Sequence, residues 1–279
     1  MTMPIDLVLV RHGESEGNVA VKASEGGDDR HFTEEYRNRH SSLWRLTDKG
    51  IGQAQAASEF IKQYIGPQFD RQYMSHYLRA QETAYWLNLP SARWREDIFI
   101  RERNWGEFDR IPASEREAVH ATSAKEKDVD PFYWCPPNGE SIADVVMRLK
   151  STIIDTLHRE CSDKRVIIVC HGEIMWAMRF LLEGLTVDQY HKLESLHDPV
   201  NRIRNCQVLW YTRRKESGEL SEKLVRASSV CPWDSDVKKQ LTANSYPVEY
   251  SQGRGNVTTE QIGSLLEQFP RIINDPISE

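Results

Sequence analysis

Apolar positions along the chain follow two spacings, which predict strands and helices in alternation. Short apolar runs predict strands at 6–10, 69–74, 165–170 and 205–212, with weaker runs at 97–100 and 223–229. A three-to-four spacing predicts helices over 47–65 and 78–89 and after the sequence NGES at 138–141. Strands that alternate with helices predict an α/β fold, a three-layer α/β/α sandwich around a mostly parallel sheet.

The run at 165–170 is expected to lie in the middle of that sheet. It is apolar throughout, which is typical of a strand covered by helices on both faces. The sequence HGEIMWAMRFLLEGL after it is apolar nearly all round and predicts a buried helix. Ser141 and Asp144 form a capping-box pattern that marks the start of the helix preceding this strand.

Two polar segments and the C-terminal part lack this periodicity. The segment 103–139 is charged and contains four prolines, so we expect a lid inserted over a site. The segment 26–44 is a second polar excursion, and beyond about residue 233 only 258–269 has a helical pattern. The sequence thus predicts one domain over 1–279, with a lid at 103–139 and a C-terminal extension at 233–279.

Composition and charge exclude some classes of partner. The formal net charge of −6 gives no global basic field of the kind that duplex nucleic acid or an anionic membrane requires. No apolar run approaches the ~20 residues of a membrane span, and the N-terminus lacks the features of a signal peptide. Five scattered cysteines without C-x-x-C spacing argue against disulfides and a structural zinc site. We therefore expect a cytoplasmic protein that captures anions at a local basic site.

Two predicted strands end alike, in the sequences LVLVRHGE and IIVCHGE. Each places a histidine, His12 or His171, before a glycine and a helix N-terminus, where free N–H groups attract anions. If the strands are neighbours, both histidines face one pocket. Arg11 and Arg79 add two guanidiniums, and Asn18 adds a neutral donor. This set fits a phosphoryl group, which arginine binds bidentately and an imidazole can attack.

Several motifs for other chemistries are absent from the sequence. No cysteine is followed six positions later by the arginine of a cysteine phosphatase loop, and no H-E-x-x-H or P-loop motif occurs. Phosphoryl transfer needs positioning and fixed positive charge, and the arginines and histidines supply both. We therefore expect neither a metal nor a cofactor.

Six motifs follow one another between about residue 6 and residue 182: RHGESEGN, LTDKGIGQA, SHYLRAQETA, IRERNWGEF, PNGES and VCHGE. Together they resemble the histidine phosphatase superfamily, in its phosphoglycerate mutase-like branch. The resemblance implies that His12 attacks phosphorus and becomes phosphohistidine, while Arg11, Arg79 and His171 hold the phosphoryl oxygens. It also implies that Glu102 protonates the leaving oxygen and later activates water.

Other residues are candidates for the same site. Glu96 and Glu107 lie close to Glu102 in sequence, and only the family position favours Glu102 among the three. The candidates for phosphate contact, beside the arginines and His171, are Asn18 and Gly172. The candidates for the substrate side are Ser24, Trp105 and Glu140.

The catalytic set does not by itself distinguish a phosphatase from a mutase. Mutases of this family carry an arginine pair before a proline run, whereas the sequence here reads VDPFYWCPPNGES. This departure favours a metal-independent phosphomonoester hydrolase acting on a small phosphorylated metabolite or a phosphoprotein. The alternatives are a cofactor-dependent phosphoglycerate mutase and a phospho-ligand binding module without turnover. Whether the chain forms a homodimer stays open.

Overall fold

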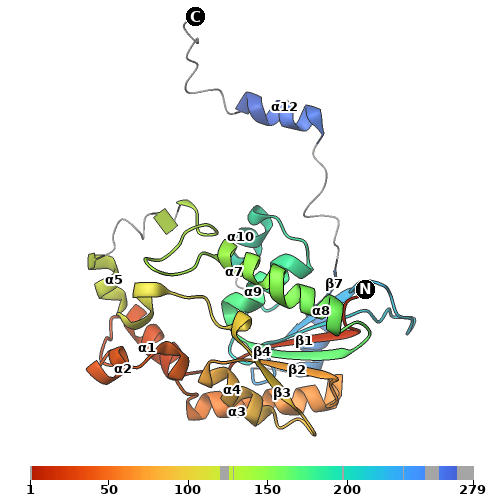
Figure 1. The fold of residues 1–279 in the computed structure, drawn as a ribbon, viewed down its shortest axis with the longest axis horizontal. Coiled ribbons are helices and arrows are strands. Elements are labelled where there is room, and N and C mark those ends of the chain that lie inside the picture. Colours follow the sequence, from red (N-terminus) through yellow and green to blue (C-terminus); the bar gives the residue numbers. More distant parts are fainter. Residues whose placement is uncertain are drawn as a thin grey trace, which may run out of the picture.

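The computed structural model describes residues 2–119, 126–127, 129–196, 198–234, 236–248 and 258–268. Its strands form one seven-stranded sheet in the order β3-β2-β4-β1-β5-β6-β7 (Figure 1). They are β1 (Asp6–Arg11), β2 (Arg71–Ser75), β3 (Trp94–Asp97), β4 (Arg165–Cys170), β5 (Val208–Thr212), β6 (Arg226–Val230) and β7 (Ser245–Pro247). Strands β3, β2, β4 and β1 are parallel, whereas β5, β6 and β7 continue the sheet by antiparallel pairing. The α/β class is confirmed, and the sheet is mixed rather than parallel across its whole width.

Helices cover both faces of this sheet, which confirms the three layers (Figure 1). On one face lie α3 (Asp48–Phe60), continued by the π-turn η2 (Ile61–Ile65), α4 (Leu78–Leu87) and α11 (Val237–Ala243). On the other lie α7 (Ile142–Leu149), η5 (Lys150–Ile154), α8 (Asp155–Glu160), α9 (Gly172–Leu182) and α10 (Val187–Ser195).

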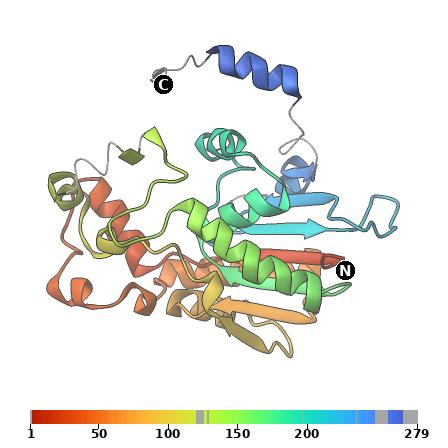
Figure 2. The same cartoon turned by 45° about the horizontal axis from the view of Figure 1, so that its top comes forward.

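The remaining helical elements lie outside these layers. They are α1 (Glu16–Glu25), α2 (Glu34–Asn38), η1 (Ser41–Leu43), η3 (Ile98–Ile100), η4 (Gly106–Arg110), α5 (Ala113–Val119) and α12 (Thr259–Gln268). Helix α12 buries none of its residues and stands clear of the sheet (Figures 1 and 2). No described helix is both long enough and apolar enough to span a membrane.

The central strands are apolar on both faces because both faces are covered. In β1, Leu7 and Leu9 point toward the helices α7 and α9, whereas Val8 and Val10 point toward α3 and α4. All four side chains are fully buried. Because β1 and β4 are parallel neighbours, the residues that follow them come out at the same edge of the sheet.

Most predicted elements are present, and one strand is misplaced. Strand β4 coincides with the predicted run 165–170, and α3 with its π-turn spans nearly all of the predicted helix 47–65. The strand predicted at 97–100 is wrong, because the strand there is β3, which ends at Asp97. The Asp97 carboxylate accepts from the Phe99 N–H at 2.8 Å, which turns the chain into η3.

Part of the segment 103–139, which was predicted as a lid, lies next to α1 and α2. Its helix α5 packs beside α1 (Figure 2), and Glu115 on α5 forms an ion pair of 2.8 Å with Arg37 on α2. Part of the C-terminal extension that begins at 233 belongs to the core of the fold: α11 joins the helix layer of α3 and α4, and β7 extends the sheet.

The contact between α3 and the turn after β1 gives a stability prediction. A Cβ atom on Gly50 would lie 2.0 Å from the Glu14 carbonyl oxygen, whereas one on Gly52 in the same helix meets nothing within 4 Å. Gly50→Ala is therefore expected to lower the free energy of unfolding by about 1–3 kcal/mol. Gly52→Ala should raise it by about 0.5–1 kcal/mol, because alanine favours the helix. Urea unfolding measures both, and equal shifts of the same sign would contradict the close approach.

Candidate active site

Two histidines lie side by side at the carboxyl edge of the sheet. Arg11 at the end of β1 pairs with Cys170 at the end of β4, so His12 and His171 follow at the same level. Their ring centroids are 5.1 Å apart. Both side chains are buried, and His12 lines a cavity of about 770 Å³. The structure thus brings together the two histidines that the sequence predicts for one site.

His12 has one ring nitrogen oriented by the backbone and the other directed at an arginine. Its Nδ1 lies 2.7 Å from the Gly13 carbonyl oxygen, which can only accept, so Nδ1 carries the proton. Arg79 Nε donates to His12 Nε2 at 3.1 Å, so Nε2 has the lone pair. Burial, followed by the charges of Arg79 and Arg11, holds the pKa of His12 well below its usual range. The ring is therefore neutral at physiological pH and can act as a nucleophile.

Two guanidiniums, those of Arg11 and Arg79, line the cavity. Arg11 Nη1 donates to the Ile203 carbonyl at 2.8 Å, and Arg79 Nη1 donates to the Ser41 carbonyl at 2.8 Å. Arg11 Nε is buried and has no hydrogen-bond partner in the described part of the chain. Gly172 lies beside Arg11: a Cβ there would be in ordinary van der Waals contact with the guanidinium carbon, at 3.5 Å. The backbone thus orients two cations whose remaining N–H groups can bind an oxyanion.

Glu102 stands opposite the histidines. Its Oε2 lies 3.9 Å from His171 Nδ1, and its Oε1 accepts from the Arg103 N–H at 2.9 Å. Burial, and then the nearby Glu173 carboxylate, raises the pKa of Glu102 to about 7. A carboxyl group with this pKa is partly protonated at neutral pH, so it can donate a proton and take one back.

His171 is fixed beneath the cavity and does not line it. Its Nε2 lies 2.9 Å from the Ser75 hydroxyl at the end of β2. Its Nδ1 is buried and has no hydrogen-bond partner among the described residues. Burial, and then the charge of Arg79, lowers the pKa of His171 well below its usual range. A neutral ring with one free nitrogen is available as a donor or acceptor to a bound group.

Asn18 lines the cavity from the first turn of α1. Its Oδ1 accepts from the Ser15 N–H at 3.2 Å and from Asn205 Nδ2 at 3.0 Å, which leaves its NH₂ group as the donor. Ser15 lies in the sequence GESEG at 13–17, which has the G-x-S-x-G spacing of a serine hydrolase. Here, however, Ser15 is the N-cap of α1, and its buried hydroxyl bonds with Asn18. It is not placed as a nucleophile.

The three candidates for the substrate side have different positions. Trp105 lines the cavity, with the Arg103 guanidinium 4.6 Å from its ring centroid. Ser24 does not line it: its buried hydroxyl donates to Asp29 at 2.5 Å and accepts from the Ala113 N–H at 2.7 Å. Ser24 thus faces the contact between α1 and α5, which its hydroxyl joins, and it does not face the cavity.

Glu140 also lies away from the cavity lining. It forms a cluster of ion pairs and hydrogen bonds beside Glu102, which we call the Glu140 brace. Its carboxylate accepts from Arg101 at 2.8 Å, from Arg148 at 3.0 Å and from the Asn104 N–H at 2.9 Å. Two of these partners flank Glu102 in sequence, so the role that the structure gives to Glu140 is to orient that segment. The rival acids face elsewhere: Glu96 accepts from Gln81 and Glu107 accepts from Asn138, each at 2.8 Å.

The cavity has further lining residues that the sequence analysis missed. They include Trp44, Phe108, Arg116, Glu173, Trp176, Arg202, Arg204, Asn205 and Trp233. Several precede β5, which runs antiparallel to β1 and so begins where β1 ends. Recognising this reversal would have pointed to the polar sequence NRIRN just before β5.

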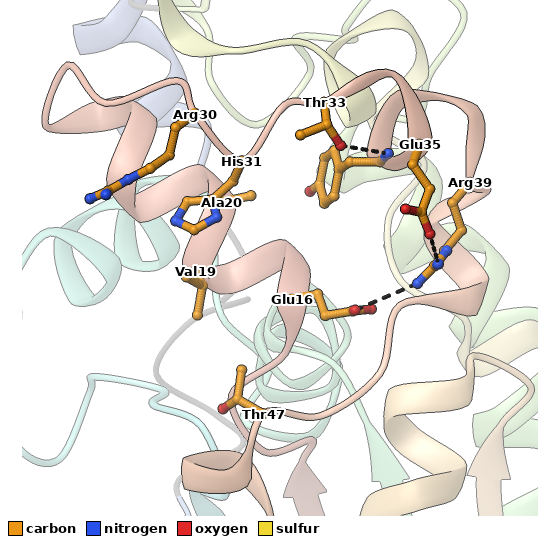
Figure 3. Close-up of a pocket in the computed structure, with 10 residues that line it drawn as sticks. Glu16, Val19, Ala20, Arg30, His31, Thr33, Glu35, Arg39 and Thr47 are labelled. Atoms are coloured by element: carbon orange, nitrogen blue, oxygen red, sulfur yellow. Dashed lines mark hydrogen bonds and ion pairs between the residues drawn. The ribbon is translucent and has the colours of Figure 1, made fainter.

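A second cavity of about 380 Å³ lies between α1 and α2 (Figure 3). Its charged side chains neutralise one another: Arg39 pairs with Glu35 at 2.6 Å and with Glu16 at 3.5 Å, and Arg30 pairs with Asp28. No cluster of a single charge faces this cavity, so it does not share the anion-binding character of the first.

A metal ion fits the site less well than an oxyanion does. One ligand atom each from His12, His171 and Glu102 lie within 4.8 Å of one another. Arg11 and Arg79 line the same cavity, and their positive charges disfavour a cation there. The donor set therefore suits a phosphoryl group.

Comparison with known proteins shows the family to which the chain belongs. The family model of the histidine phosphatase superfamily (branch 1) matches residues 7–218, and the chain belongs to that family. A 2,3-bisphosphoglycerate-dependent phosphoglycerate mutase of Methylobacterium radiotolerans is 31% identical over 199 residues, which cover 67% of this chain and 84% of the mutase. The phosphoglycerate mutase-like protein AT74 of Arabidopsis thaliana is 29% identical over 222 residues, 71% of this chain and 63% of AT74.

Solved structures share the fold at lower identity. A mycobacterial glucosyl-3-phosphoglycerate phosphatase bound to VO₃ matches with a TM-score of 0.57 and 23% identity, over 74% of this chain and 92% of that one. The α-ribazole phosphatase of Shigella flexneri matches with a TM-score of 0.58 and 19% identity, over 78% of this chain and 95% of that one. At these identities the matches establish the architecture only.

The Glu140 brace gives a second stability prediction. Glu140→Gln removes the charge that Arg101 and Arg148 share, and it should lower the free energy of unfolding by about 1–3 kcal/mol. Glu96→Gln is the control, because this carboxylate is exposed and accepts a single hydrogen bond, from Gln81, in the described part of the chain; it should shift stability by less than about 0.5 kcal/mol. Chemical unfolding of both variants checks this. A Glu140→Gln variant as stable as the Glu96→Gln control would contradict the brace.

Proposed function

We propose that the protein is a phosphomonoester hydrolase that works through a phosphohistidine on His12. The observation that carries the proposal is the placement of His12 and Glu102 on the same cavity, where the pKa of His12 is held low and that of Glu102 is raised to about 7. An unprotonated nucleophilic nitrogen and an acid for the leaving oxygen are the two groups that hydrolysis of an alkyl phosphate requires.

The proposed reaction has two steps. His12 Nε2 forms a bond to phosphorus while the bond from phosphorus to the leaving oxygen breaks, and Glu102 gives its proton to that oxygen. A water molecule then attacks phosphorus, Glu102 accepts a proton from it, and the bond between phosphorus and nitrogen breaks. Arg11 and Arg79 hold the phosphoryl oxygens in both steps, with Asn18 and His171 as further donors. The first step leaves Glu102 deprotonated, which is the state that the second step requires, and the second step restores its proton. No metal or cofactor takes part.

Phosphoglycerate mutase activity is the second candidate, because the relatives at about 30% identity include proteins of that name. A mutase must hold a second anionic group of its substrate, which calls for additional basic residues. The described part of the segment before Gly139 supplies Arg116 and Lys127 to the cavity but no adjacent arginine pair. Asp109 and Glu173 line the same cavity and offset part of that charge. These features support hydrolysis over return of the phosphoryl group.

Rapid-quench labelling tests the nucleophile. With a radiolabelled phosphomonoester in the presence of EDTA, we expect an acid-labile, base-stable phosphoenzyme that releases inorganic phosphate. His12→Ala should remove the label completely, because the attacking nitrogen is gone. The same assay with 3-phosphoglycerate separates the candidates, since a mutase yields the isomer and a phosphatase yields phosphate. Phosphate binding without any phosphoenzyme across a broad substrate panel would instead identify a binding module.

The pKa of Glu102 gives a pH prediction. Above pH 7 its carboxyl loses the proton that the leaving oxygen needs, so kcat/KM for an alkyl phosphate should fall about tenfold per pH unit. The low pKa of His12 keeps the nucleophile neutral above pH 7, so His12 adds no further change to the pH profile of kcat/KM there.

Glu102→Gln should remove the alkaline limb and lower kcat/KM for the alkyl ester by about 10²–10⁴. The same variant should hydrolyse 4-nitrophenyl phosphate with a much smaller loss in kcat/KM, because nitrophenolate leaves without a proton. Equal losses with both substrates would exclude Glu102 as the acid.

A further inference from the structure

A short loop, residues 201–205, connects the proposed phosphate site to the C-terminal part of the chain. The Ile203 carbonyl accepts from Arg11 Nη1 at 2.8 Å. Asn205 Nδ2 donates to Asn18 Oδ1 at 3.0 Å and to the His12 carbonyl at 3.2 Å. Three groups expected at the phosphate, Arg11, Asn18 and His12, are therefore oriented by two residues of this loop.

One end of the loop is held by the turn after β6. Trp233 Nε1 donates to the Asn205 carbonyl at 2.6 Å. Asp234 forms an ion pair of 2.6 Å with Arg204, whose guanidinium lies 5.5 Å from the Trp233 ring centroid. Trp233 also lines the cavity. Two consecutive residues of the turn therefore bond to two consecutive residues of the loop.

The turn itself is anchored on helix α11. The Gln240 side chain accepts from the Cys231 N–H at 2.8 Å and donates to the Cys231 carbonyl at 3.1 Å. Both residues are buried. Because Gln240 bonds to both backbone groups of Cys231, the backbone of Cys231 has little conformational freedom. Helix α11 therefore sets the position of the turn from which Trp233 reaches the loop.

The other end of the loop is tied to β7 through a buried polar network. Arg179 on α9 donates to Asn201 Oδ1 at 3.1 Å and pairs with Glu183 at 2.9 Å. Tyr246 on β7 donates its hydroxyl proton to Glu183 at 2.9 Å. Both ends of the loop thus depend on residues beyond 218, where the match to the family model ends.

From these contacts we infer that Trp233 is a positioning residue, which acts through Asn205 to orient the donors of the phosphate site. The inference rests on the proposed function only for the statement that this site binds phosphate. The side-chain amide of Asn205 donates to both Asn18 and the His12 carbonyl, so a shift of Asn205 moves both. A hydrogen-bond donor that is displaced by a fraction of an ångström binds an anion less well. The C-terminal extension therefore forms part of the site.

The test compares two tryptophans that each donate one indole hydrogen bond. Trp233→Phe keeps an aromatic ring at the turn and removes the N–H that reaches Asn205. Trp210→Phe is the matched control: Trp210 packs against the same face of the sheet, and its N–H reaches Asp6, at the start of β1 and far from the site edge. The affinity for inorganic phosphate, measured by calorimetry, should fall about threefold to tenfold in Trp233→Phe. It should stay within about twofold of the unmodified protein in Trp210→Phe.

A double-mutant cycle separates positioning from general stability. Asn205→Ala removes the amide that reaches Asn18 and the His12 carbonyl, so Trp233→Phe should weaken phosphate binding much less in that background. Wild-type affinity in Trp233→Phe, equal losses in the two tryptophan variants, or strict additivity with Asn205→Ala would each overturn the inference. Because the readout is binding, a protein that binds phosphate without hydrolysing any ester refutes the proposed function and still decides the role of Trp233.

Discussion

The site depends on the parallel pairing of β1 with β4. In this register the last residues of the two strands, Arg11 and Cys170, are level, so His12 and His171 enter the same space. A shift by two residues would separate the rings by more than the reach of one phosphoryl group. Both strands are buried between two helix layers, whose side chains pack against them in this register.

Burial has opposite effects on the two kinds of titratable group in the site. It lowers the pKa of the imidazoles and raises the pKa of Glu102, since in each case it disfavours the charged form. The guanidiniums of Arg11 and Arg79 add to the effect on the histidines and oppose it on Glu102. The result is a neutral imidazole beside a carboxyl group that is partly protonated at neutral pH. If both groups had their ordinary pKa values in water, the proton would lie on the imidazole.

The sequence was most informative where function lies next to a strongly patterned element. His12 and His171 follow apolar strands directly, so both their presence and their convergence could be predicted, and Arg79 lies in the first turn of the helix after β2. Glu140 was misjudged because its partners, Arg101 and Arg148, come from other segments, and a carboxylate that orients a neighbour has the same sequence signature as one that binds substrate. Trp233 was missed for a related reason: it reaches the site only because β5 reverses direction and β6 returns. Helix α10 was missed because its exposed face weakens the apolar periodicity.

The position of β1 also bears on how the chain folds. The first strand in the sequence lies in the middle of the sheet, and its neighbours β4 and β5 come from far along the chain, with Asp6 paired to both Arg165 and Thr212. Pairings of such long sequence separation close large loops, which slows folding and delays it until the later strands are available. During synthesis, β1 therefore leaves the ribosome long before either partner exists. An N-terminal fragment that ends before β5 would carry the nucleophile on an unpaired strand edge, exposed to association with other chains.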